Sequence, residues 1–128
     1  MKSINPKEAF QFLKSHPSAV LIDVRSEIEY LFVGHPVGSI HVAWNDGPEW
    51  EINPDFVTDV KKIANESRAV LLICRSGVRS LEAGQVLEDS GFKHVYNVLH
   101  GFEGDLDESH KRSSQNGWRF DNLPWEQC

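Results

Sequence analysis

Hydrophobic residues in this chain occur in two arrangements: short unbroken runs, and longer stretches in which they recur every three or four positions. The unbroken runs have the length of β-strands and are rich in valine, isoleucine and leucine. We predict strands at 20–24, 39–43, 70–73 and 94–99, and a short edge strand at 3–4. The periodic stretches predict amphipathic helices over 6–16 and 53–65, and a third helix that begins at Ser80.

Strands separated by helices along the whole chain indicate an α/β fold. The runs at 20–24 and 70–73 contain few polar residues, as expected for parallel strands that are covered on both faces. We therefore expect a doubly wound, mainly parallel sheet with helices on both faces. Ligand sites in such folds lie beyond the carboxyl ends of the strands, and Cys74 follows one of these ends.

Capping residues mark where two of the helices begin. Asn5 followed by Pro6 is a typical helix start, and Ser26 with Glu29 has the spacing of a capping box before a short helix. Gly91 is suited to end the helix that follows Ser80. In that helix we expect these residues to face inward: Leu81, Gly84, Val86 and Leu87.

The final stretch, 101–128, has no clear apolar period, and we predict a helix start at Gly101 followed by a loop. Its large apolar side chains should make it fold back as an irregular tail rather than stay free. They are Trp118, Phe120, Leu123 and Trp125. The length of 128 residues and the 40% hydrophobic content fit one globular core, so we expect residues 1–128 to form a single domain.

Charge and cysteine content exclude several classes of protein. The net charge of −6 gives no support to nucleic-acid binding and argues against adhesion to anionic membranes. No stretch approaches the roughly 20 apolar residues of a membrane span, and no apolar signal core is present, so we expect a cytoplasmic protein. Two cysteines do not make a disulfide framework, and a reducing compartment would keep Cys74 available for chemistry.

The residues after the strand 70–73 combine a cysteine, two arginines and a glycine just before a helix. The first N–H groups of a helix have no partner within it, so they bind anions, and neighbouring arginines add positive charge. Gly77 tolerates the positive φ that a loop of inward N–H groups requires. Because such surroundings stabilise a thiolate, we predict that Cys74 is a nucleophile. The predicted anion-binding loop comprises Arg75, Ser76, Gly77, Val78 and Arg79.

Each of these residues also has a structural interpretation. A lone cysteine that ends an apolar strand is often only a small buried hydrophobic residue. Arg79 either binds the anion, through its guanidinium or its N–H, or pairs with a carboxylate, and the role of Arg75 is equally open. For Asp23 and Arg25 we favour a supporting role at this edge of the sheet, although charged residues at a strand end can also touch substrate.

No metal or cofactor is expected. The six histidines include no pair at the spacing of metal ligands. Trp44 and Trp50 are predicted to be packing residues, with lining of the substrate entrance as the alternative. Cys128 could accept a sulfur from Cys74, but we expect an inert terminal thiol.

The pattern Cys74-x-x-Gly77-x-Arg79 after an apolar strand resembles the active-site loop of rhodanese-like sulfurtransferases. The resemblance covers nearly the whole chain and implies a rhodanese-like fold. It also implies a thiosulfate sulfurtransferase that moves a sulfur atom through a persulfide on Cys74. The donor would be a compound such as thiosulfate, and the acceptor would be cyanide, a small thiol or a protein. Two further segments look like those of single-domain bacterial members: Asp23-Val24-Arg25 and Gly101-Phe102-Glu103-Gly104.

Two other functions stay open for the same loop. Phosphatases and arsenate reductases of related folds also use a cysteine-to-arginine loop, but theirs has five intervening residues, whereas four lie between Cys74 and Arg79. A non-catalytic interaction module is the second alternative, because many rhodanese-like domains of that kind lack the cysteine. The presence of Cys74 favours an enzyme.

Overall fold

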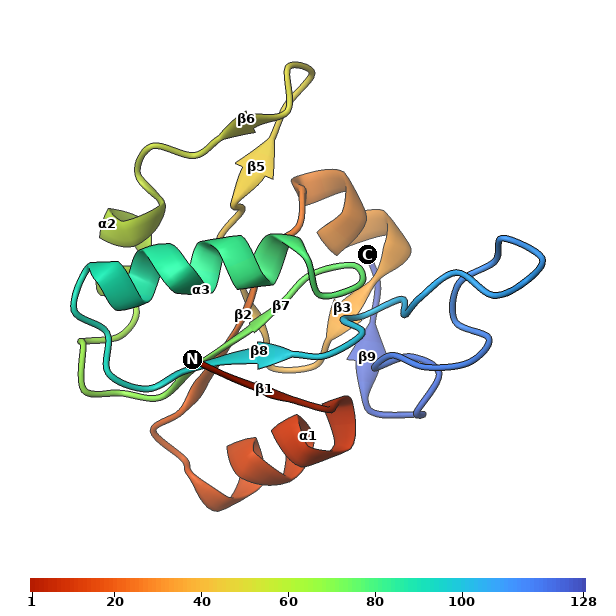
Figure 1. Ribbon diagram of the computed structural model, residues 1–128, viewed down its shortest axis with the longest axis horizontal. Helices are drawn as coiled ribbons and strands as arrows, with labels where there is room; N and C mark the ends of the chain where they lie inside the picture. The colour runs from red at the N-terminus through yellow and green to blue at the C-terminus, as the bar shows by residue number, and fades with distance from the viewer.

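The centre of the fold is a five-stranded sheet in which every neighbouring pair of strands is parallel (Figure 1). The computed structural model describes residues 1–128. The order across the sheet is β1 (Lys2–Ile4), β8 (Val95–Val98), β7 (Val70–Ile73), β2 (Val20–Asp23) and β4 (Ile40–His41). The predicted α/β fold with a parallel sheet is therefore confirmed. Of the predicted strands, the one at 39–43 is reduced to the two residues of β4.

Helices cover both faces of this sheet (Figure 1). The helix α1 (Pro6–Ser15) lies on one side, and α2 (Phe56–Lys61) and α3 (Arg79–Asp89) lie on the other. A short π-helix, η1 (Glu29–Val33), follows β2. Two small antiparallel pairs complete the chain: β3 (His35–Pro36) with β9 (Trp125–Glu126), and β5 (Asn45–Asp46) with β6 (Glu51–Ile52). No helix has both the length and the apolar character needed to cross a membrane.

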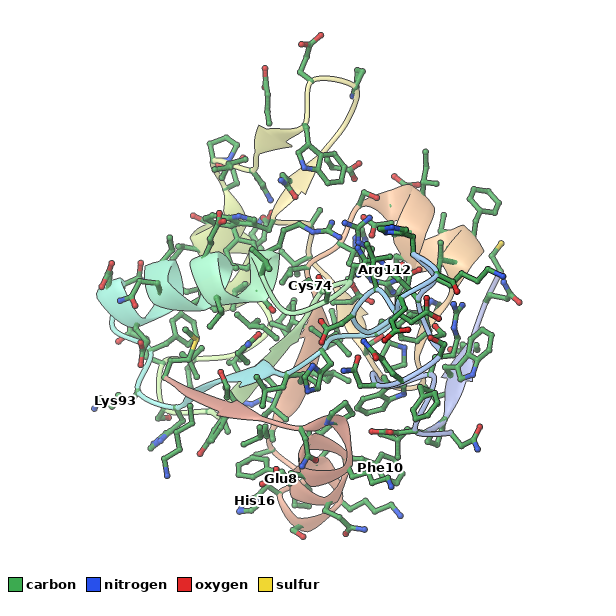
Figure 2. The ribbon with its side chains drawn as sticks, turned by 45° about the vertical axis from the view of Figure 1, so that its right-hand side comes forward. Glu8, Phe10, His16, Cys74, Lys93 and Arg112 are labelled. Carbon is green, nitrogen blue, oxygen red and sulfur yellow. The ribbon has the colours of Figure 1, made fainter.

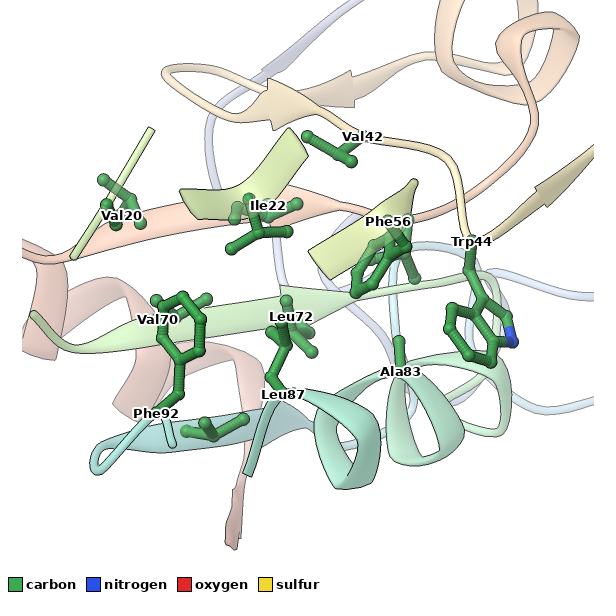
Figure 3. Close-up of a cluster of buried hydrophobic side chains, with 14 of the residues drawn as sticks. Val20, Ile22, Val42, Trp44, Phe56, Val70, Leu72, Ala83, Leu87 and Phe92 are labelled. Carbon is green, nitrogen blue, oxygen red and sulfur yellow. The ribbon is translucent and has the colours of Figure 1, made fainter. Parts of the chain in front are cut away.

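The side chains of β7 alternate between two hydrophobic cores. Val70 and Leu72, with Cys74 just beyond the strand, belong to the core beneath α2 and α3, part of which is shown in Figure 3. Leu71 and Ile73 point to the opposite face and belong to the core beneath α1. All four strand residues are completely buried. This double burial explains the unbroken apolar run, and it fixes the point at which the Cys74 loop leaves the sheet.

Capping residues predict two of the helix starts correctly. The side chain of Asn5 accepts a hydrogen bond from the Glu8 N–H at 2.8 Å, and Glu8 in turn accepts from the Asn5 N–H. The Ser26 and Glu29 capping box also forms: the Ser26 N–H donates to Glu29 Oε1 at 3.3 Å. The helix expected over 53–65 is shorter, because α2 begins at Phe56 and its last turn tightens after Lys61.

The inward face of α3 differs from the prediction: Leu81 is not part of it, and Ser80 and Ala83 are. Leu81 was expected to face inward but is 43% exposed. The buried positions are Ser80, Ala83, Gly84 and Leu87. Ala83, Gly84 and Leu87 lie three, four and seven positions after Ser80, which faces inward and reaches Cys74. Leu81 is one position further round the helix and therefore faces outward.

No helix begins at Gly101, so that prediction is wrong. Gly101 has a φ of +61°, which a right-handed helix does not allow, and the N–H groups after it bond to the cysteine loop instead of to a helical turn. The chain beyond is irregular and returns to the sheet. Trp118 is 1% exposed and packs edge-on against Phe10 of α1 at 5.9 Å between ring centroids, whereas Trp125 stays 38% exposed.

Candidate active site

Cys74 lies at the carboxyl end of β7 and is only 1% exposed. Its Sγ accepts a hydrogen bond from the backbone N–H of Gly77 at 3.0 Å. That contact requires the loop to turn back on itself, which Gly77 allows with a φ of +103°. The backbone N–H groups of Ser76 and Val78 donate to no protein group. The loop therefore holds the sulfur with one donor and leaves others available to an anion.

A second hydrogen bond to the sulfur comes from a side chain that the sequence analysis did not single out. Ser80 Oγ lies 3.2 Å from Cys74 Sγ and also donates to Asn97 Oδ1 of β8. A hydroxyl carries only one hydrogen, so while Ser80 donates to Asn97, the hydrogen between Ser80 and Cys74 belongs to the thiol. If Ser80 turns its hydrogen to the sulfur, it supports the thiolate instead. The pair can thus accommodate both protonation states of Cys74.

The outer side of the loop is fixed by the segment that follows β8. The carbonyl of Cys74 accepts from the Phe102 N–H at 2.8 Å, and the carbonyl of Arg75 accepts from the N–H groups of Glu103 and Gly104 at 3.0 and 3.2 Å. Gly101 sits so close that a Cβ there would clash with the carbonyls of Cys74 and Arg75. These contacts keep the loop carbonyls away from the sulfur and so leave N–H groups on its inner side.

Arg79 pairs with Glu29 across the mouth of the loop. Its Nη1 lies 2.8 Å from Oε1 and its Nη2 lies 2.9 Å from Oε2. Burial by itself would raise the pKa of Glu29, but the hydrogen bonds and charge of Arg79, with help from Ser26, lower it to about 2. Burial likewise opposes the charge on Arg79, yet Glu29, and more weakly Cys74 and Asp23, raise its pKa. Of the two roles left open for Arg79, the structure therefore shows the carboxylate pairing.

Asp23 and Arg25 form an ion pair that is fully buried. Arg25 Nη2 donates to Asp23 Oδ2 at 2.6 Å and Nε donates to Oδ1 at 2.9 Å. The same guanidinium bonds the carbonyl of Gly34 and lies over the ring of Phe102, 4.6 Å from its centroid. Its Nη1 has no hydrogen-bond partner. The pair connects the end of β2 to the turn after η1 and to the segment that clamps the loop.

A cavity of about 730 Å³ opens beside Cys74. It is lined by the cysteine loop except Gly77, by Trp50, and by Glu103 and Arg112 of the C-terminal segment. Residues in and just before η1 complete the lining: Ser26, Ile28, Glu29 and Val33. Trp50 therefore lines the entrance, its ring 5.4 Å from the Arg79 guanidinium, whereas Trp44 packs in the core edge-on to Phe56. Figure 2 shows Cys74 and Arg112 on this side of the molecule.

Arg112 was not singled out from the sequence. It belongs to a polar, irregular segment with no pattern that could place it near Cys74. A guanidinium N–H of Arg112 donates to the carbonyl of Gly104 at 2.8 Å. The exposed Cys128 lies outside this cavity, with its N–H bonded to the carbonyl of Leu31 at 2.9 Å. No group of three or more histidine, cysteine or acidic side chains is arranged to hold a metal ion.

Comparisons with known proteins extend beyond the loop. A family model described as the rhodanese-like domain matches residues 6–108. An uncharacterized protein of Rickettsia conorii is 31% identical over 131 residues, which cover 98% of each chain. The thiosulfate sulfurtransferase GlpE of Haemophilus influenzae is 25% identical over 80% of this chain and 86% of its own. The crystal structure of Rv0390 from M. tuberculosis is 36% identical, with a TM-score of 0.90 and coverage of 100% of this chain and 98% of that one.

Proposed function

Because this chain belongs to the family of rhodanese-like domains, we propose that it is a thiosulfate-type sulfurtransferase in which Cys74 carries the sulfur. The observation that carries the proposal is the contact of Cys74 Sγ with the Gly77 N–H at 3.0 Å, in a loop whose other N–H groups are free. The adjoining cavity gives a donor access to the loop. The similarity to GlpE, a thiosulfate sulfurtransferase, supports the same reaction.

The first step transfers a sulfur atom from the donor to Cys74. The Cys74 thiolate attacks the outer sulfur of thiosulfate, a bond forms between the two sulfur atoms, and the sulfur–sulfur bond of thiosulfate breaks with its electron pair leaving on sulfite. The outer sulfur of the resulting persulfide carries the negative charge. Donors from Ser76, Gly77 and Val78 stabilise that charge as it develops. This is the role proposed for the predicted loop.

The second step transfers the sulfur from the Cys74 persulfide to an acceptor. Cyanide or a thiolate attacks the outer persulfide sulfur and leaves as thiocyanate or as a new persulfide, while the electron pair of the broken bond returns to Cys74. A protein thiol can act as acceptor in the same way. Each step forms one bond and breaks one, and the electron pair of the broken bond stays on the leaving group. The cycle therefore needs no separate redox cofactor or metal.

The test is a mass measurement. We expect incubation with thiosulfate, without reductant, to add one sulfur atom to the intact protein, peptide mapping to assign it to Cys74, and cyanide to remove it. Cys74→Ser should abolish the addition while leaving the circular dichroism spectrum unchanged. The matched control, Cys128→Ser, removes the other cysteine and should still be charged.

Absence of added sulfur on a reduced, alkylatable Cys74 would overturn the proposal. Hydrolysis of an aryl phosphate or reduction of arsenate by the same sample would then favour oxyanion chemistry in the loop. A Cys74 that resists alkylation in the folded protein would favour the non-catalytic interaction module.

A further inference from the structure

We propose that Arg112 binds the anionic group of the sulfur substrate while Cys74 reacts with its sulfur, and so sets a preference for anionic donors and acceptors. The inference deepens the sulfurtransferase activity proposed above and rests on it. It concerns a residue outside the cysteine loop, 38 positions further along the chain by number (112 − 74). Three observations carry it: the partners of the neighbouring arginines, the attachment of Arg112 to the loop, and the size of the cavity.

Two arginines around the cysteine loop are committed to carboxylates. Arg25 is buried in its ion pair with Asp23, and Arg79 is held by both oxygens of Glu29. Arg112 has no carboxylate oxygen within 4.0 Å, even though Glu103 lines the same cavity. Arg75 also lines the cavity without a carboxylate partner, but its side chain is exposed, whereas Arg112 is half-buried. An anion entering the cavity therefore finds in Arg112 a partly buried guanidinium that is not already neutralised.

Arg112 is tied to the cysteine loop through a single residue, Gly104. Its Nη1 donates to the carbonyl of Gly104, and the N–H of Gly104 donates to the carbonyl of Arg75, the residue after Cys74. One arm of the guanidinium is thereby fixed, and Arg112 is half-buried. The N–H groups of its other arm are not bonded to the protein, and Arg112 lines the same cavity as Cys74. Figure 2 labels both residues. A fixed guanidinium loses less conformational entropy on binding than a free one.

The cavity has room for a substrate that reaches both residues. Pockets for organic ligands measure about 300 to 1,000 Å³, and this one measures about 730 Å³. Ile28, Val33 and Val78 give part of its wall an apolar surface. A small thiol or thiosulfonate that carries a carboxylate or sulfonate fits this distribution: its charged group meets Arg112 and its carbon part meets the apolar wall.

The first test measures anion capture without any sulfur transfer. Iodoacetate and iodoacetamide alkylate the Cys74 thiolate by the same displacement of iodide and differ in charge. The measurement is made in a Cys128→Ser background, where Cys74 is the single cysteine. There Arg112→Gln should lower the ratio of the iodoacetate rate to the iodoacetamide rate about fivefold. This is the effect expected from losing one charge-assisted contact that is partly exposed to solvent. Lys111→Gln removes the same charge from the exposed neighbouring residue and should leave the ratio unchanged.

The second test measures sulfur transfer itself, first from thiosulfate to the enzyme and then from the persulfide to a thiol. With Arg112→Gln we expect the KM for thiosulfate to rise about tenfold with a smaller change in kcat, because the lost contact binds the donor rather than the reacting bond. Transfer to mercaptoacetate, an anionic thiol, should slow, whereas transfer to the neutral 2-mercaptoethanol should not. Arg112→Lys keeps the charge and should retain more of the anion preference, which separates loss of charge from loss of folding.

The two proposals fail in different ways. If the wild-type protein forms no persulfide but its alkylation ratio depends on Arg112, anion binding stands and the sulfurtransferase proposal falls. If the persulfide forms and Arg112→Gln matches Lys111→Gln in both the alkylation ratio and the KM for thiosulfate, the role assigned to Arg112 is wrong.

Discussion

Arg79 and Glu29 form a bidentate ion pair, in which Nη1 donates to Oε1 at 2.8 Å and Nη2 donates to Oε2 at 2.9 Å. The same carboxylate accepts a hydrogen bond from the hydroxyl of Ser26 at 2.9 Å. One acidic side chain therefore caps η1 and also holds the first residue of α3. It joins two segments 50 residues apart at the mouth of the cavity beside Cys74.

Glu29→Gln should destabilise the fold by about 2 kcal/mol near neutral pH, between the values for exposed and buried ion pairs. The pKa of Glu29 is lowered from 4.5 to about 2, so the folded state favours the carboxylate. Its contribution is fully present above about pH 4.5 and is lost as the pH falls toward 2. Urea unfolding over that pH range should therefore show the stability difference between wild type and variant shrinking with acid.

Glu27→Gln is the matched control, because Glu27 is an exposed neighbour whose side chain makes no ion pair. It should leave the free energy of unfolding nearly unchanged. A Glu29→Gln variant as stable as wild type at neutral pH would show that the ion pair does not hold η1 to α3.

Ser80→Ala should slow alkylation of Cys74 by iodoacetamide about tenfold near neutral pH, because a hydrogen bond to an ionised partner is worth about 1.5 kcal/mol. It also leaves Asn97 Oδ1 without the donor that it has in the wild type. Ser90→Ala, at the far end of α3, removes a hydroxyl that bonds only the Val86 carbonyl and should not change the rate. Equal rates for the two variants would exclude Ser80 from the stabilisation of the thiolate.

Gly101→Ala should disrupt the site and destabilise the fold by about 3 kcal/mol or more, because its Cβ would collide with backbone atoms of Cys74 and Arg75 that cannot move freely. Gly47→Ala provides the comparison. Gly47 also has a positive φ, +79°, but nothing lies within 4 Å of a Cβ there, so only the conformational cost of about 1 kcal/mol applies. For Gly101→Ala we expect both the midpoint temperature of thermal unfolding and the yield of persulfide to fall. For Gly47→Ala the yield of persulfide should not change.

Asp23→Asn should cost about 3 kcal/mol, since it leaves the Arg25 guanidinium buried without a counter-charge. Asn keeps an oxygen for the Arg25 N–H, so the loss reports mainly the charge. The double variant Asp23→Asn with Arg25→Met removes the stranded charge and should be more stable than Asp23→Asn in urea unfolding. A double variant that is less stable than the single one would mean that Arg25 is held mainly by Gly34 and Phe102.

The sheet could be predicted from the sequence because every residue of β2 and β7 is buried, and strands buried on both faces are recognisable as unbroken or nearly unbroken apolar runs. The helix starts were predictable for a similarly local reason, since Asn5 and Ser26 bond residues three positions away. The large apolar side chains of 101–128 also indicated that this segment folds back, but its contact with the cysteine loop could not be predicted, because the N–H groups after Gly101 are satisfied by residues far back in the sequence. A local pattern contains no signal of such a contact.

The same limit applies to the candidate site. A cysteine, a glycine and a helix start within a few residues make the loop around Cys74 visible in the sequence. Asn97 gives a weak signal of the site, because it is a polar residue inside an otherwise largely apolar strand. The bond between Arg79 and Glu29 depends on how η1 and α3 meet, and the position of Arg112 depends on an irregular segment with no period. Both follow only from the assembled fold.

The clamp on the cysteine loop also bears on how the protein is made. Pairing of β1 with β8 cannot form until synthesis has reached Val98, and the loop cannot be held by Phe102, Glu103 and Gly104 until synthesis has reached residue 104. Pairing of parallel strands over such distances along the chain is slow. The thiol of Cys74 therefore leaves the ribosome well before the structure that encloses it. Its protection from oxidation during that interval depends on the speed of folding, not on the finished fold.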